Sequence, residues 1–315
     1  MNNRESIHYF CDAMKTSPFA IWLSAARPKT LPLALASIMT GSALAYWNNH
    51  ASATITIMAF VTATLLQILS NLANDYGDAV KGTDNDERLG PQRAMQSGLV
   101  TQATMKKAIG INIVLTIISG LILVFSSLHQ TMDIIGFIIL GLLAIGAAIA
   151  YTMGDKPYGY RGLGDISVFI FFGLLGVAGT YYLQTGHLSS SLLLPAIACG
   201  LLAVAVLNIN NLRDIDNDAA CGKMTLAVRM GPNWGRKYHA IIIAISFTCL
   251  ALFSATQIHS LAGWLFLIPA PFVLNHVISV MRAPDGEAIR PMMGTVVQCA
   301  LFTNIFFSLG LYLSI

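Results

Sequence analysis

The chain has 315 residues, of which 55% are hydrophobic and only 10% are charged. A soluble domain carries about 25% charged residues, so the composition excludes an ordinary soluble protein and indicates a polytopic membrane protein embedded in a lipid bilayer. The formal net charge of +3 does not indicate a nucleic-acid partner, and neither that nor an obligate protein partner is expected.

Residues 1–30 are predicted to form a cytoplasmic or interfacial N-terminal segment. The stretch 7–23 has the mixed character of an amphipathic helix that lies on the membrane surface. Lys15, Arg27 and Lys29 are charges that would hold this end in the cytoplasm. Pro28 follows Arg27 directly and marks the entry to a helix, because proline fits a first helical turn.

Nine apolar runs follow, and each is long enough to cross a bilayer, which takes about 20 residues. They lie near 31–47, 53–73, 106–127, 133–152, 165–184, 190–209, 238–257, 261–281 and 293–314. The sequence therefore predicts an all-α polytopic membrane protein with nine transmembrane helices, organised as a single domain over 1–315.

The basic residues predict the orientation of this bundle. With the N-terminus in the cytoplasm, all 18 Lys and Arg fall on the cytoplasmic side. The opposite loops, near 48–52, 128–132, 185–189 and 258–260, hold none. Such an asymmetry fixes orientation. We expect a multi-pass protein of the bacterial cytoplasmic (inner) membrane, with two long cytoplasmic loops near 74–105 and 210–237.

The first long loop opens with an acidic stretch. If the preceding helix continues through it, Asn71, Asp75 and Asp78 occupy positions i, i+4 and i+7 and share one helical face. Carboxylates this close repel one another unless water or a cation neutralises them. Mg²⁺ takes oxygen ligands and often shares them with a diphosphate. The stretch favours a Mg²⁺–diphosphate site at the membrane surface, with a solvated acidic loop as the alternative.

A second acidic stretch opens the other long loop. On a helix, Asn211, Asp214 and Asp218 fall at i, i+3 and i+7, whereas Asp216 points elsewhere. Both stretches face the cytoplasm, and basic residues follow each of them. The pair predicts two Mg²⁺ ions bridging one diphosphate, with Lys and Arg side chains taking the remaining phosphate oxygens.

Residues 74–78 (NDYGD) and 214–218 (DIDND) resemble the NDxxDxxxD and DxxxD motifs of the UbiA superfamily of intramembrane aromatic prenyltransferases. One departure is that the last aspartate of the first motif would fall at Gly82, and the next acid is Asp84. The segments 27–32, 69–78, 156–165 and 210–218 are most similar to the branch that uses 1,4-dihydroxy-2-naphthoate in menaquinone synthesis. The likeness covers nearly the whole chain from Arg27 onward.

This resemblance implies the all-helical nine-span fold, Mg²⁺ dependence and a reaction. A polyprenyl group would pass from polyprenyl diphosphate to 1,4-dihydroxy-2-naphthoate, with loss of diphosphate and CO2, giving demethylmenaquinol. The expected metal ligands are Asp75, Asp78, Asp84, Asp214 and Asp218. The expected substrate-binding residues are Asn71, Asn74, Arg93, Asn211, Lys223, Lys29 and Tyr158. The expected catalytic residues are Lys156, Asp165 and Tyr151.

The catalytic residues are predicted for different reasons. Lys156 follows Tyr151 in a stretch that resembles the family's Tyr–Lys motif, and a solvated charge that serves topology is its alternative. Asp165 lies where the fifth span begins, and an acid at that depth is functional by default. It would bind a ring hydroxyl or accept its proton. Its alternative role is a carboxylate that favours the helix dipole.

Three other functions are alternatives. A member of the same family would use 4-hydroxybenzoate, haem or homogentisate as acceptor. An ion-coupled secondary transporter holds its acids near the midplane, whereas these acids cluster at one surface. A phosphatidyl transferase expects a tight DxxDGxxAR run, and this chain lacks one.

Overall fold

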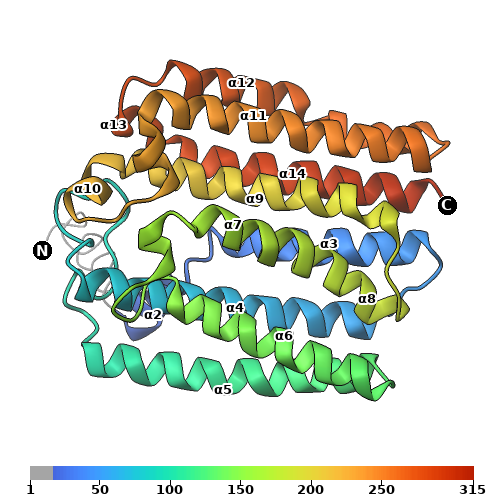
Figure 1. The fold of residues 1–315 in the computed structure, drawn as a ribbon, viewed down its shortest axis with the longest axis horizontal. Coiled ribbons are helices and arrows are strands. Elements are labelled where there is room, and N and C mark those ends of the chain that lie inside the picture. Colours follow the sequence, from blue (N-terminus) through green and yellow to red (C-terminus); the bar gives the residue numbers. More distant parts are fainter. Residues whose placement is uncertain (1–16) are drawn as a thin grey trace, which may run out of the picture.

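The computed structural model describes residues 17–315, and every regular element within them is helical (Figure 1). The long helices lie side by side along one axis. In chain order the elements are α2 (Pro18–Ala26), α3 (Leu31–Trp47), α4 (Ala53–Val80), α5 (Gln102–Ser127), α6 (Thr131–Ala150), η1 (Tyr158–Arg161), α7 (Gly164–Val168), η2 (Phe169–Gly179), α8 (Thr180–Thr185), η3 (Ser190–Leu192), α9 (Leu193–Arg213), α10 (Ile215–Ala220), α11 (Leu226–Gln257), η4 (Leu261–Leu267), α12 (Ala270–Arg282), α13 (Gly286–Ile289) and α14 (Met292–Leu313).

Eight helices in this part of the chain are long and apolar enough to cross a membrane, and there are nine if the bent pair α2–α3 counts as one span. The two helices of this pair meet at an angle of 52°. The predicted all-helical membrane bundle is therefore confirmed. Residues 7–16 of the predicted surface helix, and Lys15, lie outside the described residues. In the described part of the chain, α2 begins at Pro18, and the Ser17 side chain caps it by accepting a hydrogen bond from the N–H of Ala20.

The connections between helices fall at two opposite ends of the bundle (Figure 1). One end carries the segments 81–101, 151–163, 214–225 and 283–291, and the other carries 48–52, 128–130, 186–189 and 258–260. Every Lys and Arg of residues 17–315 lies toward the first end, in these connections, in the helical turns near them, in the first part of α11 or, for Arg27 and Lys29, in the turn between α2 and α3. The alternation of loops that the predicted spans require is therefore present.

Helix α4 continues through the first acidic stretch, as the spacing predicted. Ser52 caps its N-terminus by accepting from the N–H of Ile55, and the helix ends just before Gly82, which has a φ of 73°. Gly77 lets α4 approach the end of α6 closely, because a Cβ at this position would lie 2.6 Å from the carbonyl oxygen of Thr152. The acidic turns of α4 are therefore held against the rest of the bundle.

Helix α9 lies inside the bundle, packed against α11, η2 and α14. The prediction of one continuous helix through the second acidic stretch is wrong. Helix α9 ends at Arg213, Asp214 takes a non-helical conformation (φ −99°, ψ 17°), and α10 follows. Helix α11 begins at Leu226, earlier than the predicted span at 238, and kinks at Gly231 before Pro232. The second loop is therefore shorter than predicted.

Candidate functional site

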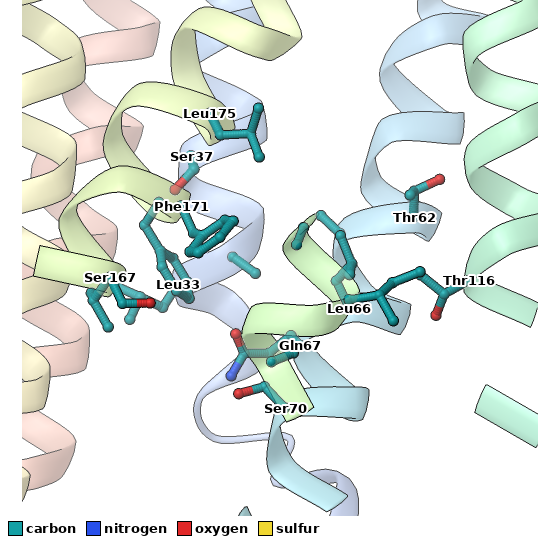
Figure 2. Close-up of a pocket in the computed structure, with 18 of the residues that line it drawn as sticks. Leu33, Ser37, Thr62, Leu66, Gln67, Ser70, Thr116, Ser167, Phe171 and Leu175 are labelled. Carbon is teal, nitrogen blue, oxygen red and sulfur yellow. The ribbon is translucent and has the colours of Figure 1, made fainter. Parts of the chain in front are cut away.

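A cavity of about 430 Å³ lies between α3, α4, α5, α6, η2 and α9. Figure 2 shows its apolar body, where Leu33, Leu66 and Phe171 extend into the space between the helices. Gln67 and Ser70 add polar groups from α4. Toward the end of the bundle that carries the acidic stretches, the lining becomes charged and amide-rich and includes Asn71, Asn74, Asp78, Arg93, Asn211 and Lys223. The cavity thus joins an apolar chamber to a polar mouth.

The last turns of α4 supply two buried carboxylates, and of the five predicted metal ligands only Asp78 lines the cavity itself. Asp75 is 1% exposed and Asp78 is 2% exposed. Asp78 Oδ1 accepts a hydrogen bond from the Tyr160 hydroxyl at 2.8 Å, and its Oδ2 lies 2.7 Å from Arg93 Nη1 and 3.5 Å from Lys223 Nζ. Asp75 Oδ1 accepts a longer bond of 3.4 Å from the N–H of Met95.

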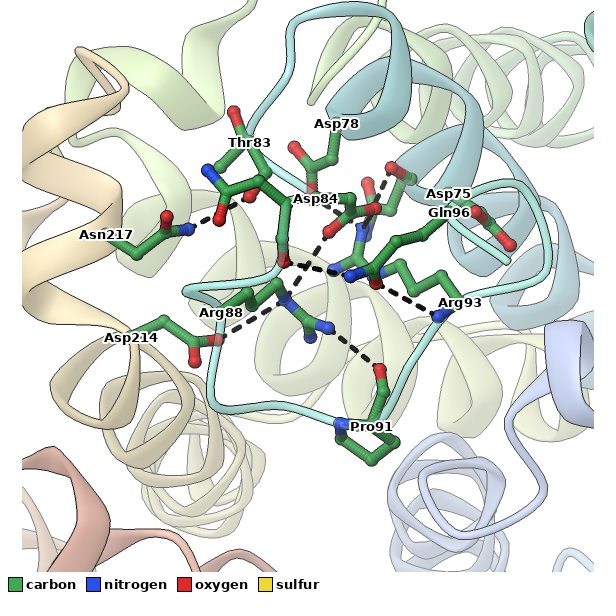
Figure 3. A network of polar contacts seen from close by, with 12 residues as sticks. Asp75, Asp78, Thr83, Asp84, Arg88, Pro91, Arg93, Gln96, Asp214 and Asn217 are labelled. Carbon is green, nitrogen blue, oxygen red and sulfur yellow. Dashed lines mark hydrogen bonds and ion pairs between the residues drawn. The ribbon is translucent and has the colours of Figure 1, made fainter. Parts of the chain in front are cut away.

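The loop after α4 folds back over these carboxylates (Figure 3). Arg93 Nη1 donates to Asp78 at 2.7 Å and to Asp84 at 2.9 Å. Arg88 Nε lies 3.4 Å from Asp84 and 3.6 Å from Asp214, so it links the two acidic stretches. Burial raises the pKa of Asp84. Burial would lower the pKa of Arg93, but the charges of Asp78 and Asp84 raise it above its ordinary value.

The second stretch contributes Asp214 and Asp218, which are 5% and 3% exposed. Asp214 Oδ1 accepts from Arg213 Nε at 3.0 Å. Burial opposes its ionisation, but the hydrogen bond and charge of Arg213 lower its pKa. Among the described residues, Lys223 is the one cation within ion-pair distance of Asp218, at 3.7 Å. Burial raises the pKa of Asp218 to about 6, and the nearby charges of Asp214 and Asp78 add to this shift. Asp216 is exposed, so the two motif acids face inward despite the break in the helix.

The donor chemistry of the mouth fits a hard cation that is only partly bound by protein. No three His, Cys, Asp or Glu side chains of residues 17–315 form a complete metal-binding group, because arginine and lysine side chains stand between the carboxylates. Mg²⁺ keeps several waters and binds through one or two carboxylates together with substrate phosphates. Arginine and lysine side chains lie among buried carboxylates in two sets, and this arrangement fits that mode; the carboxylates are those of Asp75, Asp78, Asp84, Asp214 and Asp218.

Two of the predicted basic residues lie away from the mouth. Lys29 and Lys156 are both exposed, and neither lines the cavity. Arg27, two residues before Lys29, lines it instead. Lys156 precedes a tight turn that directs Tyr160, rather than the lysine, toward Asp78.

The predicted tyrosines line the cavity, and Asp165 lies behind them. Tyr151 and Tyr158 pack edge to face with their ring centroids 5.3 Å apart. Tyr158 donates to the Ala147 carbonyl at 2.9 Å. Asp165 is buried and accepts from the Tyr238 hydroxyl at 3.2 Å, while its Oδ2 has no hydrogen-bond partner among the described residues.

The side-chain amides of Asn71 and Asn74 connect α4 to neighbouring segments by hydrogen bonds. Asn71 donates to the carbonyl of Ala26 at 2.9 Å, which ties α4 to the turn between α2 and α3. Asn74 Oδ1 accepts from the Thr152 hydroxyl at 3.2 Å. Asn211 lines the cavity from α9.

Sequence reasoning missed several residues of the mouth, namely Arg88, Arg213, Tyr160 in its contact with Asp78, and Arg27. The first two adjoin the acidic stretches in the sequence, and this proximity was the available signal. What the sequence did not supply is the direction of each side chain.

Together, membrane-length helices enclose an apolar chamber that opens into a mouth of carboxylates and cations. The chain belongs to the UbiA prenyltransferase family, which matches residues 34–307. It is 56% identical over 293 residues to "1,4-dihydroxy-2-naphthoate octaprenyltransferase" of Escherichia coli (strain K12), covering 93% of this chain and 95% of that protein.

Two further relatives extend the comparison. A protein of the same description from Mycobacterium tuberculosis (strain ATCC 25618 / H37Rv) is 36% identical over 275 residues, covering 87% of this chain and 91% of that one. The solved structure of a UbiA homologue from Archaeoglobus fulgidus bound to DMAPP and Mg²⁺ has a TM-score of 0.62 at 13% identity, covering 91% of this chain and 99% of that one. This last likeness shows a shared fold.

Proposed function

We propose that this protein transfers a polyprenyl group from polyprenyl diphosphate to 1,4-dihydroxy-2-naphthoate, releasing diphosphate and CO2 and forming demethylmenaquinol. The acceptor comes from the description of the relative that is 56% identical over nearly the full length. The observation that carries the proposal is the continuity of an apolar chamber with a mouth of buried carboxylates and cations. This arrangement suits a long prenyl chain with a diphosphate head.

We propose Asp75 and Asp78 from α4, and Asp214 and Asp218 from the second stretch, as the residues that hold two Mg²⁺ ions. Asp84, which pairs with Arg93 and Arg88, would support them. When bound, the ions supply Lewis-acid stabilisation of the negative charge on the leaving diphosphate. Ligation would release the cations that now pair with these carboxylates.

The cations of the mouth would bind phosphate oxygens. Arg93 and Lys223 both contact Asp78 and line the cavity, so each needs only a local rearrangement to reach a diphosphate there. Arg88 sits between the two acidic stretches and would close the mouth over the head group. Lys29 and Lys156 are exposed, and we assign them the solvated role of fixing membrane orientation.

The chamber would protect the allylic cation that forms when the C–O bond breaks. Its apolar walls exclude water, which would otherwise capture the cation. Tyr151 and Tyr158 present their aromatic rings at the boundary between chamber and mouth. Asp165, whose Oδ2 has no hydrogen-bond partner among the described residues, would accept a proton from the ring hydroxyl or position Tyr151. We place the protein in the bacterial cytoplasmic membrane with the mouth facing the cytoplasm.

The test is turnover by the purified protein in lipid vesicles. A labelled polyprenyl diphosphate, Mg²⁺ and 1,4-dihydroxy-2-naphthoate should yield prenylated naphthoquinol and CO2, and excess chelator should abolish the product. Parallel reactions with 4-hydroxybenzoate and homogentisate test the acceptor. Product with one of those acids and none with the naphthoate would overturn the proposed acceptor, and full turnover in chelator would overturn the role of the metal.

A further inference from the structure

Arg27 is a cavity-lining arginine without an assigned partner. Its Nη2 atom is buried and makes no hydrogen bond with the residues that the structure describes, and no carboxylate of residues 17–315 lies within ion-pair distance of it. The other arginines of the mouth differ, since Arg88, Arg93 and Arg213 each pair with an aspartate. A buried guanidinium nitrogen without a hydrogen-bond acceptor is costly.

The backbone at Arg27 also favours a different residue. Its φ of 52° and ψ of 65° place it in the left-handed region, which glycine adopts without steric cost and other residues adopt rarely. Apart from Asn49, no other non-glycine residue within 17–315 has a positive φ. Strain of this kind is tolerated at ligand-binding positions. A strained backbone under a side chain that lines the cavity is typical of a ligand-binding position.

The turn that carries Arg27 is fixed firmly. Arg27 N–H donates to the carbonyl of Ser24 at 3.1 Å, and its own carbonyl accepts from the N–H of Thr30 at 2.9 Å. Asn71 holds the preceding carbonyl from α4 at 2.9 Å. These bonds hold the backbone of the turn at the level of Asn71, one helical turn nearer the apolar chamber than Asp75, and Arg27 lines the cavity from this turn.

From these observations we infer that Arg27 is an anion-binding residue of the cavity, whose ligand is a substrate oxyanion, either the carboxylate of the aromatic acceptor or a phosphate of the prenyl donor. Arginine suits both because its planar guanidinium presents two parallel N–H donors. Its position on the chamber side of the mouth favours the carboxylate. The inference rests on the proposed function for the identity of the two substrates.

Direct binding tests this inference without turnover. The probes are 1-hydroxy-2-naphthoate, which is a stable aromatic acid, 1-naphthol, which lacks its carboxylate, and Mg²⁺ with inorganic pyrophosphate. Affinities for each would be measured by calorimetry on the full-length protein in detergent. For Arg27→Gln we expect binding of the naphthoate to weaken by at least about tenfold while binding of naphthol is unchanged. Lys29→Gln, an exposed neighbour, is the matched control and should bind all probes normally.

A second variant separates binding from folding. In Arg27→Gly the backbone strain is relieved, so this protein should unfold at a temperature no lower than that of the wild type, yet lose the same affinity as Arg27→Gln. A selective loss of pyrophosphate binding instead would identify the donor's phosphate as the anion. Unchanged affinity for both anions, or an equal loss for naphthol, would overturn the inference. Because these are binding measurements, they stay interpretable even if the proposed reaction fails.

Discussion

Asp216 and Asp218 lie two positions apart on α10 but in opposite environments. Asp218 is buried beside Lys223, whereas Asp216 is exposed. If Asp218 holds a metal ion, Asp218→Ala should lower turnover by at least about 100-fold, on the order of 3 kcal/mol of transition-state stabilisation. Asp216→Ala should change it little. Turnover at saturating Mg²⁺, normalised for protein amount, is the measurement, and an equal fall in both variants would contradict the assignment.

The environment of Asp218 also predicts a pH-dependent stability in the metal-free protein. Burial raises the pKa of this carboxyl from 3.8 to about 6. Between these values the folded state retains a proton that the unfolded chain has lost, so the free energy of unfolding falls as the pH rises through this window. In chelator, Asp218→Asn should therefore be more stable than the wild type at pH 7.5, by on the order of 2 kcal/mol.

At pH 4 most of this difference should disappear, because the carboxyl of the folded wild type is then almost fully protonated and that of the unfolded chain is protonated in part. Thermal unfolding at the two pH values measures it. Asp216→Asn, at an exposed position, is the control and should match the wild type throughout. A stabilisation by Asp218→Asn that is the same at pH 4 and pH 7.5 would show that its cause is not the charge.

At the scale of the element, the contact between α4 and the end of α6 positions the first carboxylates. A Cβ on Gly77 would lie 2.6 Å from the Thr152 carbonyl oxygen, and the Thr152 hydroxyl donates to the Ala73 carbonyl at 2.9 Å. Gly77→Ala should therefore push the two segments apart and cost about 1–3 kcal/mol of stability. Gly110→Ala, on exposed α5 where a Cβ meets nothing within 4 Å, is the matched control. Equal unfolding temperatures for the two variants would refute the close contact.

The bounds of some helices can be predicted from local sequence, and the bounds of others cannot. The spacing of Asn71, Asp75 and Asp78 predicted that α4 continues to the mouth, because a periodic face is a local property. The interruption at Asp214 was not predictable in this way. Asp214 contacts Arg88, which is far away in the sequence, and a contact of that kind is decided by tertiary packing.

The same limit applies to the basic residues. Lys156 and Tyr160 lie in one short segment, and only the turn between them decides which one reaches Asp78. Likewise Arg27 and Lys29 are close in the sequence, yet only Arg27 lines the cavity. Sequence reasoning found the stretches that form the mouth, and the structure supplied the direction of each side chain.

At the scale of the whole molecule, the Lys and Arg side chains of the described residues lie toward one end of the bundle. Every Lys and Arg of residues 17–315, together with the five buried aspartates of the mouth, lies toward that end, whereas the loops at the other end hold neither Lys nor Arg. Positive charge beside spans favours the cytoplasmic side. The end where we propose that an anionic head group binds is thus the same end that the charge rule assigns to the cytoplasm.

This orientation is testable with single cysteines introduced at exposed positions toward the two ends of the bundle. In a background whose native cysteines are replaced by serine, Gln130→Cys and His259→Cys should react with a membrane-impermeant maleimide added from the periplasmic side. Asp86→Cys and Asn233→Cys should react only from the cytoplasmic side, in inverted vesicles. All four positions are exposed, so a difference in labelling reports sidedness rather than burial. Gln130 and Asp86 flank the single helix α5, which must carry the chain across the bilayer between them. If both labelled from one side, α5 would not span the membrane, and the orientation of every later helix would change.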